Sequence, residues 1–81
     1  MRLGLRFDRR DAPGLRAWAG RVRNGELGPD ANANTYEQAA RAAESGEPLE
    51  VYCSDPIEVV QMAALYTAHG FTQPVIEELN G

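Results

Sequence analysis

The sequence predicts a small α/β domain with two layers, in which helices cover one face of a three-stranded sheet and the elements follow the order β-α-α-β-α-β. Three short segments alternate apolar and polar residues with the period of a half-buried strand, and three longer ones carry apolar residues at helical spacing. Each predicted strand has a polar face, which a sheet covered on both faces would lack. The 81 residues predict a single domain, residues 1–81.

The N-terminal third predicts a strand followed by a helix. In residues 2–7, leucine and phenylalanine alternate with arginine and glycine, as in a strand with one buried face. Asp11 is typical of a helix N-cap, and Pro13 is tolerated in the first helical turn. Apolar residues then recur at spacings of three, four and seven as far as Val22, and an Asn-Gly pair at 24–25 predicts the end of the helix.

The middle of the chain predicts a loop and a second helix. Residues 25–34 are rich in glycine, proline and asparagine, and this loop is long for so small a domain, which indicates a functional loop or a flexible connection. Thr35 with a glutamine three positions later predicts a capping box, and Asn34 with its glutamate predicts a competing one. The inner face of the helix is mostly alanine, and Gly46 ends it.

The last third predicts a strand, a helix and a strand. Residues 49–53 alternate, and Asp55 then stands at an N-cap with proline and glutamate at the first and third helical positions. The helix extends to about His69, before Gly70, and is apolar nearly all round, so it is either central or covered on a second side by a partner. With a last strand over residues 75–79, this unit predicts a right-handed parallel crossover.

Charge is distributed unevenly along the chain. Residues 1–24 contain seven of the eight basic residues, all arginine, and only two acids, a net charge of +5. Residues 25–81 contain one arginine and ten acids, a net charge of −9, so the whole chain carries −4. This net acidity argues against direct nucleic-acid binding, because contacts with phosphate need clustered cations.

Two interpretations account for this polarity. In the first, Arg2 and Arg6 share the open sheet face with Glu50 and Glu78, and the other charges form a solvated surface. In the second, the acids bind a protein partner that has a basic surface. The predicted contacts are Glu37, Glu44, Glu47, Asp55, Glu58, Glu77 and Glu78. The unprotected sheet edges and the apolar third helix also predict a homodimer.

Cys53 is the only cysteine. This excludes an internal disulfide and a cysteine-based zinc site, and it favours a reducing, cytoplasmic setting. The residue follows a predicted strand and precedes a helix N-terminus, where partial positive charge lowers the pKa of a thiol. Cys53 is therefore a candidate catalytic residue, and a buried structural cysteine is the alternative.

Two partial resemblances bear on Cys53. The pieces that match the last third of a rhodanese domain are residues 51–53, 63–65, 70–71 and 75–81. The resemblance implies a persulfide on Cys53, but residues 53–56 are Cys-Ser-Asp-Pro and lack that family's glycine and cation. Residues 46–51 and 54–56 resemble TusA-type sulfur carriers, although no cysteine stands in the matching residues 7–10.

The remaining candidates point to packing. His69, the only histidine, is expected at the surface at the end of a helix, and Trp18 and Tyr36 are expected in the core. No spacing in the sequence predicts a catalytic triad, a phosphate loop or a metal site, so neither a metal nor a cofactor is expected. No apolar run approaches the ~18 residues of a membrane span, and no signal peptide is evident, so no membrane partner is expected.

These observations lead to two hypotheses of function. In size and acidity, but in no motif, the chain resembles the small phage-encoded anti-CRISPR inhibitors. That resemblance implies a non-catalytic interaction module that blocks a cationic nucleic-acid-binding surface of a host complex. The alternative is a sulfurtransferase-like or redox protein that uses Cys53.

Overall fold

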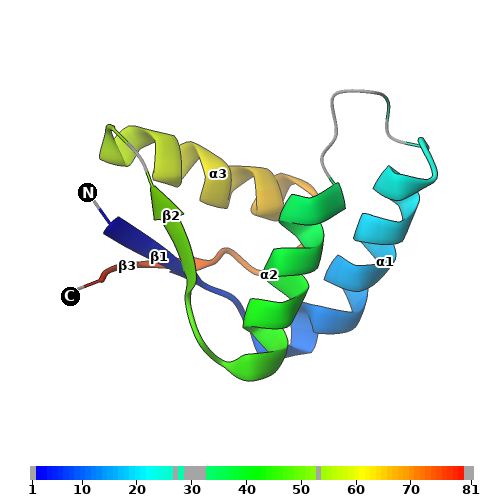
Figure 1. The fold of residues 1–81 in the computed structure, drawn as a ribbon, viewed down its shortest axis with the longest axis horizontal. Coiled ribbons are helices and arrows are strands. Elements are labelled where there is room, and N and C mark those ends of the chain that lie inside the picture. The colour runs from blue at the N-terminus through cyan, green and yellow to red at the C-terminus, as the bar shows by residue number, and fades with distance from the viewer. Residues whose placement is uncertain (1, 27, 29–32, 53, 80–81) are drawn as a thin grey trace.

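The computed structural model describes residues 2–26, 28, 33–52 and 54–79 and confirms the predicted fold class (Figure 1). The elements in chain order are β1 (Arg2–Arg6), a 3-10 turn η1 (Arg9–Asp11), α1 (Ala12–Arg23), α2 (Ala33–Ser45), β2 (Leu49–Tyr52), α3 (Pro56–Ala68) and β3 (Val75–Glu78). No helix in this part of the chain has both the length and the apolar character needed to cross a membrane.

The three strands form a sheet in the order β2-β1-β3, and β1 runs antiparallel to both neighbours. The first strand of the chain is therefore the central one, with leucines at its two helix-facing positions. Because β2 and β3 both oppose β1, they run parallel to each other, as the predicted crossover requires. They are not neighbours, since β1 lies between them (Figure 1).

The register assigns each side chain of β1 to a face. Leu3 and Leu5 are buried under the helices, whereas Gly4 lies opposite Glu50 on the open face. A Cβ at Gly4 would lie 2.9 Å from the Cβ of Pro48 and 3.1 Å from a methyl carbon of Leu79. Only glycine therefore lets the flanking chain close over the middle of the sheet.

The helical layer surrounds a small core. Helix α2 packs against α1 and β2, and α3 packs against β3, whereas α1 lies beyond the sheet on the far side of α2 (Figure 1). Alanines on the inner face of α2 allow close approach to its neighbours. The cluster of buried residues contains Leu3, Leu5, Phe7, Ala12, Leu15, Ala39, Ala40, Ala42, Ala43, Val59, Ala63 and Tyr66.

Local signals located some helix ends and missed others. Asp55 caps α3 as predicted, since its Oδ1 accepts a hydrogen bond from the N–H of Ile57 at 3.0 Å. Asp11 occupies the N-cap position of α1, but its Oδ2 instead accepts a hydrogen bond from the N–H of Thr72 at 2.8 Å. Both predicted capping boxes of the second helix are wrong, because that helix begins at Ala33 and their first residues lie inside it. Much of the predicted 25–34 loop lies outside the described residues.

Candidate functional site

Two ion pairs connect the strands across the open face of the sheet. Arg2 Nε lies 2.7 Å from Glu50 Oε1, which confirms the predicted pair. Arg6 pairs with Glu77, at 2.9 Å between Nη2 and Oε1, and not with Glu78 as predicted. The reason is the register of β3, which turns Glu77 to the open face and Glu78 to the opposite one.

Other arginines pair with acids on or near the helices. Arg16 connects α1 to Glu44 of α2, with 3.0 Å between Nη2 and Oε2, and Arg23 pairs with Glu37. Two further pairs are local, Arg10–Asp8 and Arg21–Glu26. Because four of the six ion pairs among the described residues join the N-terminal third to later segments, much of the polarity seen along the sequence is balanced within the fold.

These contacts shift the pKa values of three carboxyl groups. A hydrogen bond from the side chain of Arg10 lowers the pKa of Asp8 to about 2. The hydrogen bond from Arg16 lowers the pKa of Glu44 in the same way. The pKa of Glu50 is lowered by its own arginine partner. These pairs are solvent-exposed, so they determine local charge more than they contribute to stability.

The structure divides the seven acids predicted to contact a partner. Three of them, Glu37, Glu44 and Glu77, form the arginine pairs described above. Asp55 caps α3. The other three, Glu47, Glu58 and Glu78, form no ion pair with any described residue. No described arginine therefore neutralises these three acids.

One end of the molecule brings several of these acids together. Strand β2 ends there, α3 begins and β3 ends, so Asp55, Glu58 and Glu78 share this end, whereas Glu47 precedes the start of β2 at the opposite end of that strand (Figure 1). Tyr52, the last residue of β2, is 77% exposed at this end, where it lies opposite Arg2 on the open face of the sheet. We call Tyr52, Asp55, Glu58 and Glu78 the acidic end.

The opposite end of the molecule is formed by α1, α2 and the last turn of α3, and we call it the helical end. The ring of His69 stacks on Trp18, with 4.7 Å between centroids and 22° between planes. The hydroxyl of Tyr36 lies 2.7 Å from Nδ1 of His69. The predicted surface position of His69 is correct only in part: the residue ends α3 as expected, but it is half-buried because the end of α3 packs against the other two helices. Trp18 and Tyr36, expected in the core, are half-buried in the same cluster.

Tyr66 lies deeper in the same cluster. It is 3% exposed, with its ring 4.9 Å from that of Phe7 and 5.5 Å from that of Tyr36, and its hydroxyl has no hydrogen-bond partner among the described residues. Burial raises the pKa of Tyr66 to about 12 and raises that of Tyr36 as well. Both phenols stay protonated at neutral pH, so neither supplies a phenolate base or nucleophile there. We interpret the cluster as packing.

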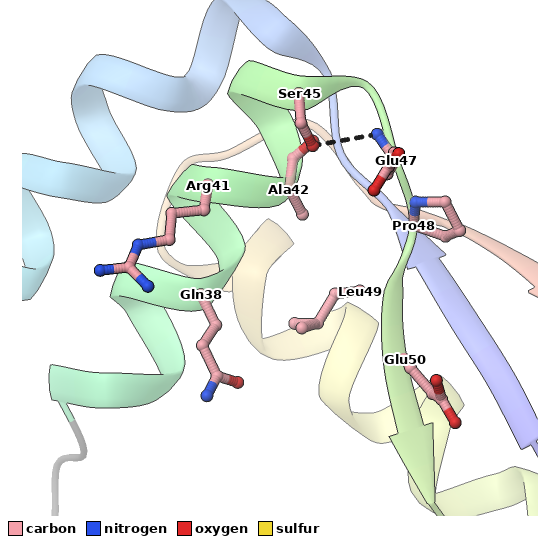
Figure 2. A pocket seen from close by; sticks show the side chains of 8 residues that line it. All are labelled: Gln38, Arg41, Ala42, Ser45, Glu47, Pro48, Leu49 and Glu50. Atoms are coloured by element: carbon pink, nitrogen blue, oxygen red, sulfur yellow. Dashed lines mark hydrogen bonds between the residues drawn. The ribbon is translucent and has the colours of Figure 1, made fainter.

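A shallow hollow of about 300 Å³ lies between α2 and β2 (Figure 2). Its lining residues are Gln38, Arg41, Ala42, Ser45, Glu47, Pro48, Leu49 and Glu50. Figure 2 shows Arg41 extending away from Leu49, while Ser45 Oγ accepts a hydrogen bond from the N–H of Glu47 at 3.2 Å. Glu50 already pairs with Arg2. The side chains of Gln38, Arg41 and Glu47 form no ion pair with another described residue, but Figure 2 shows them at separate places around the hollow, so they do not converge to fix a small ligand.

Cys53 lies outside the described residues. Near it, the carboxylate of Asp55 already accepts the N–H of Ile57, and Pro56 has no N–H to donate. These residues are a poor cradle for a thiolate or persulfide, which needs donors and a cation nearby. In the described part of the chain, no group of three or more histidines, cysteines or acids is arranged to hold a metal ion.

Comparison with known proteins found no matching family model, no matching curated protein and no matching solved structure.

Proposed function

We propose that this chain is a small, cytoplasmic, non-catalytic interaction module whose acidic end binds a protein partner with a basic surface. One observation carries the proposal. No described arginine pairs with Glu58 or Glu78, although arginines neutralise acids elsewhere, and both acids lie at the end of the molecule where Tyr52 is exposed. Unpaired carboxylates steer an oppositely charged partner toward the surface, and an exposed tyrosine supplies contact area at low entropic cost.

The basic surface that best fits this end is one that normally binds nucleic acid. Such surfaces are lined with lysine and arginine that contact phosphate. Carboxylates placed against them compete with phosphate for the same cations, and the net charge of −4 favours that approach. We therefore extend the proposal to an inhibitor that blocks a cationic nucleic-acid-binding surface of a host complex.

Charge reversal of acids at and away from the acidic end tests this proposal. Glu58→Lys and Glu78→Lys each place a cation in the acidic end, while Glu47→Lys makes the same charge change at the other end of β2. The immobilised variants are used to capture proteins from a lysate of the source cell at low and high salt, with quantification by mass spectrometry. We expect a basic, nucleic-acid-binding protein to bind the wild type and Glu47→Lys and to bind either acidic-end variant about tenfold less or weaker.

Two further arms sharpen the result. Added nucleic acid and raised salt should both release the captured protein, because its cations are then screened or occupied. Cys53→Ala should capture as well as the wild type. Capture that ignores salt, or that survives reversal at both Glu58 and Glu78, would contradict the acidic-end proposal, and capture lost with Cys53→Ala would favour the cysteine hypothesis.

A further inference from the structure

The exposed large apolar side chains are concentrated on two adjoining elements. Apart from Tyr52, those of the described residues lie on α3 or on the edge strand β3, and α3 packs against β3. They are Ile57, Val60, Leu65, Val75 and Ile76. Val75 lies opposite Arg6 on the open face of the sheet, and Ile76 lies opposite Leu5 on the face that the helices cover. The four residues other than Val75 are therefore close enough in the fold to mark a contact surface more strongly than the same residues scattered singly.

Helix α3 has two apolar faces. The first contributes Val59, Ala63 and Tyr66 to the core. The opposite, outer face is exposed along its whole length, and it consists of Ile57, Val60, Gln61, Ala64, Leu65 and Ala68. None of these is charged, and the only charged residue of the helix, Glu58, lies in its first turn. An exposed helix face in a monomer normally carries charges, so this face has the composition of one that is covered.

We propose that a second copy of this chain covers the outer face of α3, with the two α3 helices antiparallel about a two-fold axis. In such a contact each surface meets itself, so any charge on it would face a like charge. The outer face carries none, which makes it compatible with self-contact. This surface differs from the acidic end, and the inference does not depend on the proposed function.

The order of large and small residues favours the antiparallel arrangement. Ile57 lies in the first turn of the helix, and Ala64 and Ala68 lie in its second half. Antiparallel packing centred on the helix sets Ile57 opposite Ala68 of the second copy and Gln61 opposite its Ala64. At these two contacts a large side chain meets a small one, as close packing requires, while Val60 meets Leu65 of the second copy. A parallel pair would set Ile57 against itself.

The size of the contact determines its expected strength. Thirteen residues make a helix about 20 Å long. One such helix from each copy buries less than the ~1,200–2,000 Å² of a standard interface, although Ile76, on the helix-facing side of β3, adds to the apolar area. We therefore expect a reversible dimer whose population depends on concentration and which, being apolar, is not weakened by salt.

Sedimentation equilibrium from micromolar to millimolar concentration tests the proposal. The wild type should change from its monomer mass of 8.9 kDa toward twice that value. Ala64→Glu, which adds a charge to an exposed position at the centre of the face, should remain a monomer throughout. Ala17→Glu makes the same change at an exposed position of α1 and should dimerise like the wild type, with circular dichroism checking that all three are folded.

A cross-link then locates the contact. In a Cys53→Ser background, Ala64→Cys should form a disulfide-linked dimer on mild oxidation, because position 64 lies near the proposed axis, whereas Ala17→Cys should not. A wild type that is monomeric at millimolar concentration would overturn the proposal. So would a dimer that Ala64→Glu leaves intact.

Discussion

The helical end and the acidic end differ in whether their charged side chains form ion pairs and whether their aromatic side chains are packed. At the helical end, Arg16 and Arg23 pair with acids of another segment, and His69 contacts both Trp18 and Tyr36. At the acidic end, no described arginine pairs with Glu58 or Glu78, and Tyr52 is exposed. The contrast shows that polarity along a sequence does not by itself locate a charged surface, since folding pairs most of the charges.

Helix α3 extends from the acidic end to the helical end, so it connects the two physically. Its last turn leads to His69 in the aromatic cluster, and its first turn carries Glu58 at the acidic end. A chain of 81 residues has a small core and limited stability. We infer that the helical end contributes much of the tertiary packing and leaves the residues of the acidic end free to serve a partner.

The largest expected effect comes from deleting core volume at the helical end. Leu15 of α1 is 0% exposed, so Leu15→Ala should reduce the free energy of unfolding by about 2–5 kcal/mol. Leu65 of α3 is 56% exposed, so Leu65→Ala should cost roughly 0.5 kcal/mol or less when measured at micromolar concentration. Urea unfolding followed by circular dichroism gives both values. Equal losses at the two positions would contradict the assignment of Leu15 to the core and of Leu65 to an exposed face of α3.

A smaller effect tests the aromatic cluster with two matched substitutions. Tyr36→Phe removes the hydroxyl that contacts His69 and should cost about 1 kcal/mol. Tyr66→Phe removes a buried hydroxyl that has no partner among the described residues, so it should be neutral or stabilise by up to about 1 kcal/mol. Thermal and urea unfolding distinguish the two signs. A loss at Tyr66 as large as that at Tyr36 would mean that a buried water satisfies the hydroxyl.

The order and type of the elements could be predicted because their signals are local. The alternation around Leu3 and Leu5, and the Asp-Pro start of α3 at Asp55, act within a few residues. The placement of β1 between the other strands depends on long-range pairing, which local patterns do not encode. Local patterns also do not decide whether Glu77 or Glu78 lies on the open face, because a shift of one residue in register exchanges the two faces of a strand.

The candidate surfaces could be predicted only in part, for a related reason. The sequence marked Glu44 and Glu58 alike as acids after the basic third of the chain. Only the fold shows that Arg16 approaches the first and that no described cation pairs with the second. His69 was assigned to the surface because its neighbours, Trp18 and Tyr36, come from other helices. A signal for this contact existed in the inward positions of those two aromatic residues.

The smallest expected effect is the pH dependence of stability that the paired acids produce. Arginine contacts lower the pKa of Asp8 from 3.8 to about 2, and they also lower that of Glu44 from its ordinary value of 4.5. A carboxyl group whose pKa is lowered by folding stabilises the fold above its unfolded pKa, and this contribution is lost as pH falls through the folded pKa. The thermal midpoint should therefore be nearly constant from neutral pH down to about 5 and should fall below that pH toward about 2.

Two glutamine variants connect this pH profile to the contrast between the two ends. Glu44→Gln removes a carboxylate paired with Arg16, so its thermal midpoint should be lower at neutral pH and should fall less on acidification than that of the wild type. Glu58→Gln removes a carboxylate that forms no ion pair with a described residue and lies in the first turn of α3, so its thermal midpoint at neutral pH should fall less than that of Glu44→Gln. High salt should weaken the Glu44 effect, because both partners are exposed to solvent. If Glu58→Gln changed the thermal midpoint as much as Glu44→Gln, the Glu58 carboxylate would already interact with a group inside the fold. It would then not be free to bind a partner.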